Sequence, residues 1–136
     1  MNLYSYSFND AINLIDATGG FPNSWVPRYG NWGGPDWSGG WRPSQHGGAN
    51  GPNAPIDVLD AAAMRHDLAY GRWDIQPGDP NSDCWKIKEP CARNRCYRKE
   101  VADNKLTNDA NSLRGKLGSY ADWYIRGINL AFAHNE

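Results

Sequence analysis

The sequence predicts a mainly helical fold, and three observations lead to this prediction. Four segments carry apolar residues at steps of three or four, the period of an amphipathic helix. They are residues 7–20, 57–70, 96–117 and 119–134. The segments between them, 21–54 and 71–95, are rich in Gly, Pro, Asn and Trp and follow no period. The chain has 136 residues, enough for one domain with a modest core, so we expect a single domain over residues 1–136.

Charge and hydropathy argue against several classes of protein. The formal net charge is −1, which gives no electrostatic case for nucleic-acid binding. No apolar run is long enough to span a bilayer. Residues 1–6 lack a basic region and a long apolar run, so we expect no standard signal peptide. Three cysteines are too few for a scaffold with many disulfides.

The segment 57–70 is the strongest helix prediction. Its alanines and leucines are strong helix formers, Asp57 and Asp60 place negative charge in the early turns, and Gly71 is expected to end the helix. Asp67 is expected on the flank of this helix. One stripe should face the core. It consists of Ile56, Leu59, Ala63, His66 and Tyr70.

The segment 96–117 predicts a second long helix with an acidic residue on its apolar side. Its stripe is Cys96, Lys99, Asp103, Leu106, Ala110, Leu113 and Leu117. A buried carboxylate without a partner is costly, so Asp103 should pair with either Arg65 or His66. The connection 71–95 has 25 residues, which lets the two helices run antiparallel with their stripes facing. Pairing with His66 would fix the tautomer of the imidazole and support it as a general base.

His66 and Asp67 each have an ordinary interpretation as well. A lone histidine on a core-facing stripe is usually held by a backbone carbonyl, and a lone flanking aspartate is usually a solvated charge. The two together are more informative, because other segments of the chain supply a partner for each.

The loop 21–54 is long for a compact domain, which indicates either function or disorder. Disorder is a poor fit, because disordered segments are short of aromatic residues. This loop contains Trp25, Trp32, Trp37 and Trp41. Its glycines would let backbone carbonyls turn inward as a cage for a hard cation. A surface loop without an ion is the alternative, and the loop alone does not decide between them.

The cysteines and the basic residues of the second irregular segment have two interpretations each. Cysteines 84, 91 and 96 match no zinc-site spacing, which favours a single disulfide or three thiols over a zinc site. The basic residues are expected to form a solvated face, with contact to anionic lipid head groups as the alternative. They are Lys86, Lys88, Arg93, Arg95, Arg98 and Lys99.

Two further helices complete the prediction. The helix 7–20 begins at a cap formed by Ser7 and ends at Gly19. The helix 119–134 begins at Ser119 and carries a broad aromatic face, which we interpret as core packing.

Several of these residues resemble the sequence pattern of a known family. Asp60 with the alanines that follow it, His66-Asp67 and Tyr70 resemble the active-site helix of secreted phospholipases A2, Asp-x-Cys-Cys-x-x-His-Asp-x-Cys-Tyr. The segment 29–40 resembles the calcium loop of that family, Tyr-Gly-x-x-Cys-Gly-x-Gly. The segment 102–106 is similar to part of the disulfide-free phospholipase domain of parvovirus capsid proteins, and related domains occur in bacterial toxin-like proteins. The resemblance covers residues 25–117.

The resemblance implies a mainly α fold in which two long antiparallel helices carry the active site. His66 would be the general base that activates a water for attack on an ester carbonyl, Asp103 would orient His66, and Tyr70 would bond to Asp103. Calcium and a loop amide would stabilise the oxyanion, and no covalent intermediate would form. The implied calcium ligands are the carboxylate of Asp67 and the backbone carbonyls of Trp32, Gly34 and Asp36.

Two departures from the family pattern affect these expectations. The second loop glycine of the family falls on Asp36, which would either add a carboxylate to the site or shift the ligands to Gly39 and Gly40. Alanine replaces the three cysteines of the helix motif, so the chain must rely on its core and its aromatic residues. The alanines that replace these cysteines are Ala62, Ala63 and Ala69.

The residues alone predict a metal-assisted hydrolase, because a buried histidine, its carboxylate, a flanking aspartate and a Gly-rich loop are what such chemistry needs. The substrate, the sn-2 ester of glycerophospholipids at a membrane surface, comes only from the resemblance. Exposed Trp37, Trp41 and Trp25 would fit seating on a bilayer, with packing around the loop as the alternative.

The resemblance also suggests a setting. We expect a toxin, effector or virus-type protein that is secreted or delivered to a target membrane without a standard signal, and an inhibitor or immunity protein is a conceivable partner. Two other hypotheses are a catalytically silent member that binds membrane or calcium, and a zinc-binding interaction module built on the cysteines.

Overall fold

The computed structural model describes residues 28–76 and 78–132, and this part of the chain is mainly helical, as predicted. It contains the α-helices α2 (Val58–Arg72), α3 (Pro90–Asn111) and α4 (Ser119–Phe132), together with the short 3₁₀-helices η1 (Pro43–Gln45) and η2 (Cys84–Lys86). No strand occurs within the described residues. The helix predicted over 7–20 lies outside them.

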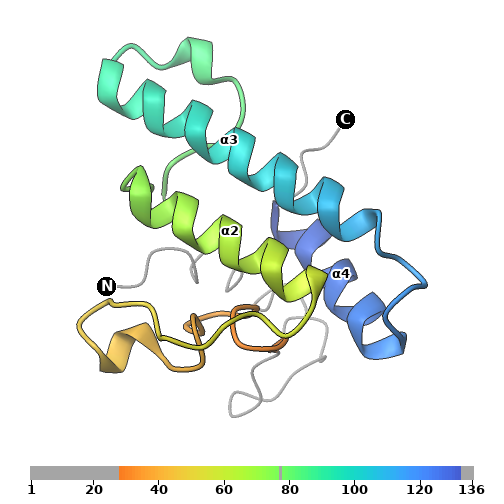
Figure 1. Ribbon diagram of the computed structural model, residues 1–136. Helices are drawn as coiled ribbons and strands as arrows, with labels where there is room; N and C mark the ends of the chain where they lie inside the picture. Colours follow the sequence, from red (N-terminus) through yellow and green to blue (C-terminus); the bar gives the residue numbers. More distant parts are fainter. Residues whose placement is uncertain (1–27, 77, 133–136) are drawn as a thin grey trace, which may run out of the picture.

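Figure 1 shows α2 and α3 side by side, with the loop that precedes α2 on the other side of α2. Contacts join the middle of α2 to the last part of α3, and the end of α2 to the first half of α3. Arg65 of α2 forms an ion pair of 3.2 Å with Asp109, near the end of α3. Arg98, in the first half of α3, stacks 3.7 Å from the ring centre of Trp73, just after α2.

The main core lies where α2, α3 and α4 meet the start of the described loop. Leu59 and Ala62 of α2 pack with Leu106 and Ala110 of α3. The members from α4 and the loop are Ala121, Tyr124, Ile125, Ile128, Phe132 and Tyr29. The predicted aromatic face of the last helix is thus partly core packing.

The ends of α2 differ in part from the prediction. Asp57 caps the first turn, because its side chain accepts a hydrogen bond of 2.8 Å from the Asp60 amide. Gly71 does not end the helix, which continues to Arg72. The left-handed residue that stops a helix comes later, at Asp74 with φ of 52°. The amide of Ile75 then bonds back to the carbonyl of Tyr70 at 3.0 Å.

The helix α3 begins six residues earlier than predicted and ends at Asn111, before the predicted end at residue 117. Pro90 occupies the first turn, where a missing amide hydrogen costs nothing. Glu89 caps the helix by accepting hydrogen bonds from the amides of Cys91 (3.1 Å) and Ala92 (2.5 Å). The apolar period begins only at residue 96, so it does not indicate this cap.

Tryptophan side chains hold the described loop together. The indole N–H of Trp32 donates to the carbonyl of Asn53, that of Trp37 to Gly30, and that of Trp41 to Ala49, each at 2.9 Å. Trp37 and Trp41 are half-buried, so the expectation that they are exposed is wrong, and packing around the loop is the better interpretation. Trp25 lies outside the described residues.

The structure decides between the interpretations of the cysteines. Cys84 and Cys96 form a disulfide that ties η2 to α3, while Cys91 is exposed and unpaired. A zinc site made of the three thiols is therefore absent from this structure. No helix in the described ranges combines the length and apolar character that crossing a membrane requires.

Candidate active site

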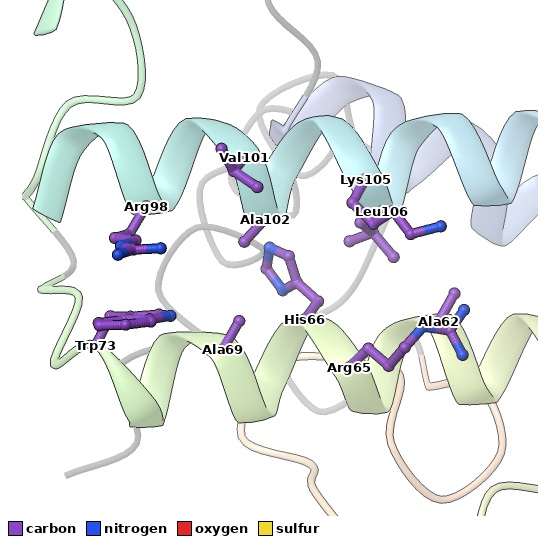
Figure 2. A pocket seen from close by; sticks show the side chains of 10 residues that line it. All are labelled: Ala62, Arg65, His66, Ala69, Trp73, Arg98, Val101, Ala102, Lys105 and Leu106. Carbon is purple, nitrogen blue, oxygen red and sulfur yellow. The ribbon is translucent and has the colours of Figure 1, made fainter.

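The centre of the site is a buried pair formed by His66 of α2 and Asp103 of α3. The Nε2 atom of His66 lies 2.7 Å from Oδ1 of Asp103. His66 is 5% exposed and Asp103 is fully buried. Figure 2 shows the His66 ring rising from α2 toward α3. Of the two partners predicted for Asp103, the structure selects His66, because Arg65 is paired with Asp109 instead.

Two more side chains donate to the Asp103 carboxylate. The hydroxyl of Tyr70 donates to Oδ1 at 2.5 Å, and the side-chain amide of Asn81 donates to Oδ2 at 2.7 Å. Burial of a carboxylate is tolerable when its oxygens accept hydrogen bonds in this way. Asn81 was not predicted. It lies in the irregular segment between α2 and α3, where no period indicates which side chain points inward.

The pairing with Asp103 determines which nitrogen of His66 is chemically available. An ionised carboxylate has no proton to donate, so Asp103 accepts hydrogen bonds from both Tyr70 and His66. The Nε2 atom of His66 therefore carries the proton. In the neutral ring Nδ1 is then the unprotonated nitrogen, and it can take a proton from a water molecule. The geometry of the pair thus suits a general base.

A second buried aspartate, Asp60, ties the loop to the start of α2. Its Oδ2 accepts hydrogen bonds from the amides of Asn31 (2.8 Å) and Ile56 (2.9 Å), and its Oδ1 accepts from the amide of Trp32 (2.8 Å). Gly30 has a φ of 57°, and a Cβ atom there would lie 2.3 Å from Asp60 Oδ2. Only glycine allows this close approach. Ile56 is 65% exposed, contrary to prediction, because it precedes the cap and does not follow the helical period.

The loop and the helix bring four predicted site residues to one small hollow. Tyr29 and Gly33 form two reciprocal backbone hydrogen bonds of 2.8 Å, which fold the residues between them into a tight turn against α2. The hollow has a volume of about 20 Å³ and is closed on one side by side chains of α4. The predicted site residues that line it are Trp32, Gly34, His66 and Asp67.

The prediction placed Asp67 on the flank of the helix. In the structure, Asp67 is buried in this hollow. It is 8% exposed, because the loop covers this face of α2. The Ser38 hydroxyl donates to Asp67 Oδ2 at 2.7 Å. Burial raises the pKa of Asp67 well above its usual value; the Ser38 hydrogen bond opposes this, and the charge of Asp60 adds to it.

Asp36 takes a different position from the other predicted ligands. Its carboxylate accepts hydrogen bonds from the amide of Ser44 (3.0 Å) and from the Ser44 hydroxyl, and Asp36 does not line the hollow. Gly39 and Gly40 join the loop to itself, because the Gly39 carbonyl accepts from Asn53 and the Gly40 amide donates to Asn31. Of the loop residues considered as ligands, Trp32 and Gly34 therefore line the hollow together with Asp67. Asp36, Gly39 and Gly40 do not.

His66 also forms part of the wall of a larger groove, of about 180 Å³, between α2 and α3 (Figure 2). Small side chains at Ala62, Ala69 and Ala102 leave this space open. Its edges carry the basic residues Arg65, Arg98 and Lys105. His66 thus lines both this groove and the small hollow that contains Asp67.

Part of the predicted basic face is used inside the molecule. Lys99 is 7% exposed and donates to the backbone carbonyl of Asp79 at 2.7 Å, and Arg95 pairs with the Asp79 carboxylate at 3.1 Å. Arg98 stacks on Trp73. The prediction of a solvated face is therefore wrong for Lys99 and Arg95, whereas Arg98 remains exposed.

Within residues 28–76 and 78–132, no three His, Cys, Asp or Glu side chains gather in an arrangement that could hold a metal ion. This observation concerns side chains only, whereas the calcium prediction relies on backbone carbonyls. The chain matches no model of a known protein family, no curated protein and no solved structure.

Proposed function

We propose that this chain is a calcium-dependent hydrolase that cleaves the sn-2 ester of glycerophospholipids. The observation that supports the proposal most is the buried His66–Asp103 pair beside the buried carboxylate of Asp67. A histidine base and an adjacent anionic site are what metal-assisted attack by water requires. The substrate class and the arrangement of two antiparallel helices with a calcium loop rest on the resemblance to phospholipases A2.

In this proposal, Nδ1 of His66 accepts a proton from a water molecule as the water attacks the ester carbonyl carbon. Asp103 stabilises the positive charge that develops on the ring, and Tyr70 and Asn81 keep the Asp103 carboxylate in place. The proton then passes from His66 to the leaving alkoxide, so that a fatty acid and a lysophospholipid are released.

The residues around Asp67 suit calcium. A carboxylate whose charged form is disfavoured by burial gains most from a cation beside it. Carboxylate and carbonyl oxygens are the ligands that calcium prefers. We propose that Asp67 and the carbonyls of Trp32 and Gly34 hold it, and leave Asp36 out because it does not line the hollow around Asp67. When bound, calcium would supply positive charge for the oxyanion.

The test is release of free fatty acid from mixed phospholipid vesicles, with calcium, with a chelator, and with His66→Ala plus calcium. We expect calcium-dependent release that falls by roughly 100- to 10,000-fold in the variant, the usual contribution of a general base. His46→Ala is the matched control, because His46 is exposed and stacks on Trp41 in the loop. Equal release by wild type and His66→Ala would refute the proposal.

A catalytically silent calcium-binding protein is the second candidate, and the position of Asp36 favours it. Asp36 does not line the hollow around Asp67, so calcium there would have fewer oxygens than expected. Calcium binding by calorimetry, without fatty-acid release under any condition, would support this candidate over the hydrolase.

A further inference from the structure

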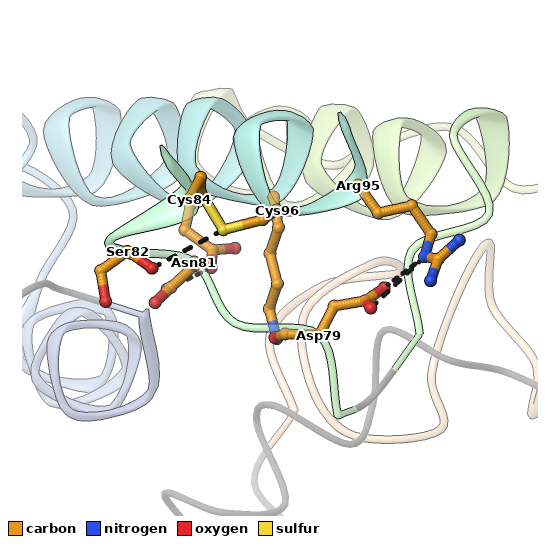
Figure 3. The surroundings of a disulfide bond; sticks show 8 residues. Asp79, Asn81, Ser82, Cys84, Arg95 and Cys96 are labelled. Atoms are coloured by element: carbon orange, nitrogen blue, oxygen red, sulfur yellow. Dashed lines mark hydrogen bonds and ion pairs between the residues drawn. A yellow bond between two sulfur atoms is a disulfide. The ribbon is translucent and has the colours of Figure 1, made fainter. Parts of the chain in front are cut away.

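The segment between α2 and α3 contributes one side chain, Asn81, that hydrogen-bonds to the Asp103 carboxylate. Figure 3 shows this segment beside the disulfide between Cys84 and Cys96, with Asn81 and Ser82 next to Cys84. We propose that Asn81 is a positioning residue for the His66–Asp103 pair, and that the Cys84–Cys96 disulfide and the Asp79–Arg95 ion pair keep it in position. The effect on catalysis rests on the proposed function, whereas the effect on the pair itself does not.

The two oxygens of Asp103 are divided between its partners. Oδ1 receives His66 and Tyr70, and Oδ2 receives Asn81 at 2.7 Å. A carboxylate can rotate about its Cβ–Cγ bond, and rotation would move Oδ1 away from the His66 ring. The hydrogen bond from Asn81 opposes that rotation, so it keeps Oδ1 directed at Nε2 although Asn81 does not touch His66.

Asn81 is held on its N-terminal side by Asp79. The Asp79 carboxylate accepts from Nε of Arg95 at 3.1 and 3.3 Å, and its backbone carbonyl accepts from Nζ of Lys99 at 2.7 Å. Arg95 and Lys99 are four residues apart on α3, hence neighbours on the helix surface. Two basic side chains thus bind one residue at two different atoms, which restricts its orientation as well as its position.

The disulfide holds the C-terminal side of the same segment. Cys84 and Cys96 are buried, and their Cα atoms are 5.5 Å apart. Cys96, Lys99 and Asp103 follow one another at steps of three and four on α3, so they share a face of the helix. The attachments of the segment and the carboxylate that Asn81 contacts therefore lie on the same rigid element.

The first test is Asn81→Ala, with Asn94→Ala as the matched control, because Asn94 is an exposed asparagine on α3. We expect kcat to fall roughly 10- to 100-fold with KM little changed, as is typical when a supporting hydrogen bond behind a catalytic group is removed. A loss of folding would change both constants. A kcat within twofold of wild type would refute the positioning role.

The second test follows the pair without turnover. The proton on Nε2 of His66 can be observed by NMR in a protein labelled with ¹⁵N-histidine, where its hydrogen bond to Asp103 shifts the signal downfield. We expect Asn81→Ala to move this signal upfield or broaden it, and Asn94→Ala to leave it unchanged. If Asn81→Ala moves the signal and the wild type shows no esterase activity, the positioning role is supported and the hydrolase is refuted. If Asn81→Ala leaves the signal unchanged, the positioning role itself is refuted.

The third test concerns the disulfide. Cys84→Ala/Cys96→Ala should lower kcat in the same way as Asn81→Ala, and the three substitutions together should cost little more than either set alone, because both act on one contact. Cys91→Ala, which removes the exposed unpaired thiol, should have no effect. Fully additive losses would refute the role of the disulfide, and if the double variant does not fold, the result for Asn81→Ala decides on the positioning role.

Discussion

The two buried aspartates beside His66 differ in how the chain supports them. Asp103 accepts hydrogen bonds from His66, Tyr70 and Asn81, which together occupy both of its oxygens. Asp67 accepts from Ser38, and burial raises its pKa well above the usual value. In the half of the site that contains His66, the protein's own hydrogen bonds hold the carboxylate in place. The half around Asp67 carries a carboxylate whose charge the protein disfavours, which is what a cation would compensate.

The largest expected effect comes from removing the charge of Asp67. Asp67→Asn should lower calcium-dependent ester hydrolysis by about 1,000-fold, because a lost charge-stabilising group in a closed site costs on the order of 100- to 1,000-fold or more. Fatty-acid release from vesicles measures it. Asp36→Asn is the control, and we expect it to keep most of the activity, since Ser44 engages the Asp36 carboxylate. Equal losses in both variants would place Asp36 in the site after all.

The next effect concerns Asp60, which attaches the loop to α2. Asp60→Ala leaves the amides of Asn31, Trp32 and Ile56 without their acceptor. Unpaired buried amides cost about 1–3 kcal/mol each, and partial relaxation of the loop should bring the total to about 3 kcal/mol. The free energy of unfolding in urea measures it. Asp83→Asn, at an exposed aspartate whose positive φ of 53° asparagine also tolerates, should change it by less than about 0.5 kcal/mol. A comparable loss in both variants would show that Asp60 is no anchor.

A smaller effect is expected in the dependence of stability on pH. The pKa of Asp67 is raised in the folded state, so its protonated form is favoured there, and stability should fall as the pH rises from about 4, the unfolded value, through the folded pKa. At pH 7 without calcium, Asp67→Asn should therefore unfold at a higher temperature than wild type. With calcium the order should reverse. Thermal unfolding at pH 4 to 8 checks both statements, and an unchanged order with calcium would contradict them.

The smallest effect is expected in the groove on the other side of His66. Ala69→Leu places an apolar side chain in the space of about 180 Å³ between α2 and α3. Burial of the added carbons should raise stability by about 1 kcal/mol, and hydrolysis should stay within twofold of wild type. Unfolding in urea and vesicle hydrolysis measure the two. A large loss of hydrolysis with intact folding would place the substrate in the groove instead of near Asp67.

The sequence predicted the parts of this site that lie on regular helices. His66, Tyr70 and Asp103 were placed correctly because the helical period is clear in their segments and a polar residue on an apolar stripe is conspicuous. The choice between Arg65 and His66 as the partner of Asp103 needed the structure, because both residues sit within one turn of α2.

The loop residues could not be placed in the same way. Ser38 and Asn81 reach their aspartates through segments without a period, across 29 and 22 residues of sequence. Whether Asp67 is buried depends on the path of the loop over α2, and that path depends on hydrogen bonds from distant amides to Asp60. Such long-range bonds leave no local pattern. The helix ends differ from the prediction for a local reason: a glycine predicts a stop at Gly71, and no apolar period accompanies the proline start at Pro90.

The indole groups that hold the loop have a practical consequence. Trp32 donates its N–H to Asn53 and also lines the hollow that contains Asp67. Its fluorescence therefore depends both on the folding of the loop and on the charge at Asp67. A cation that binds there would change the emission of an unlabelled protein, and the difference between wild type and Trp32→Phe would isolate that signal. The fluorescence of Trp32, a residue that stabilises the loop, can therefore report cation binding at Asp67.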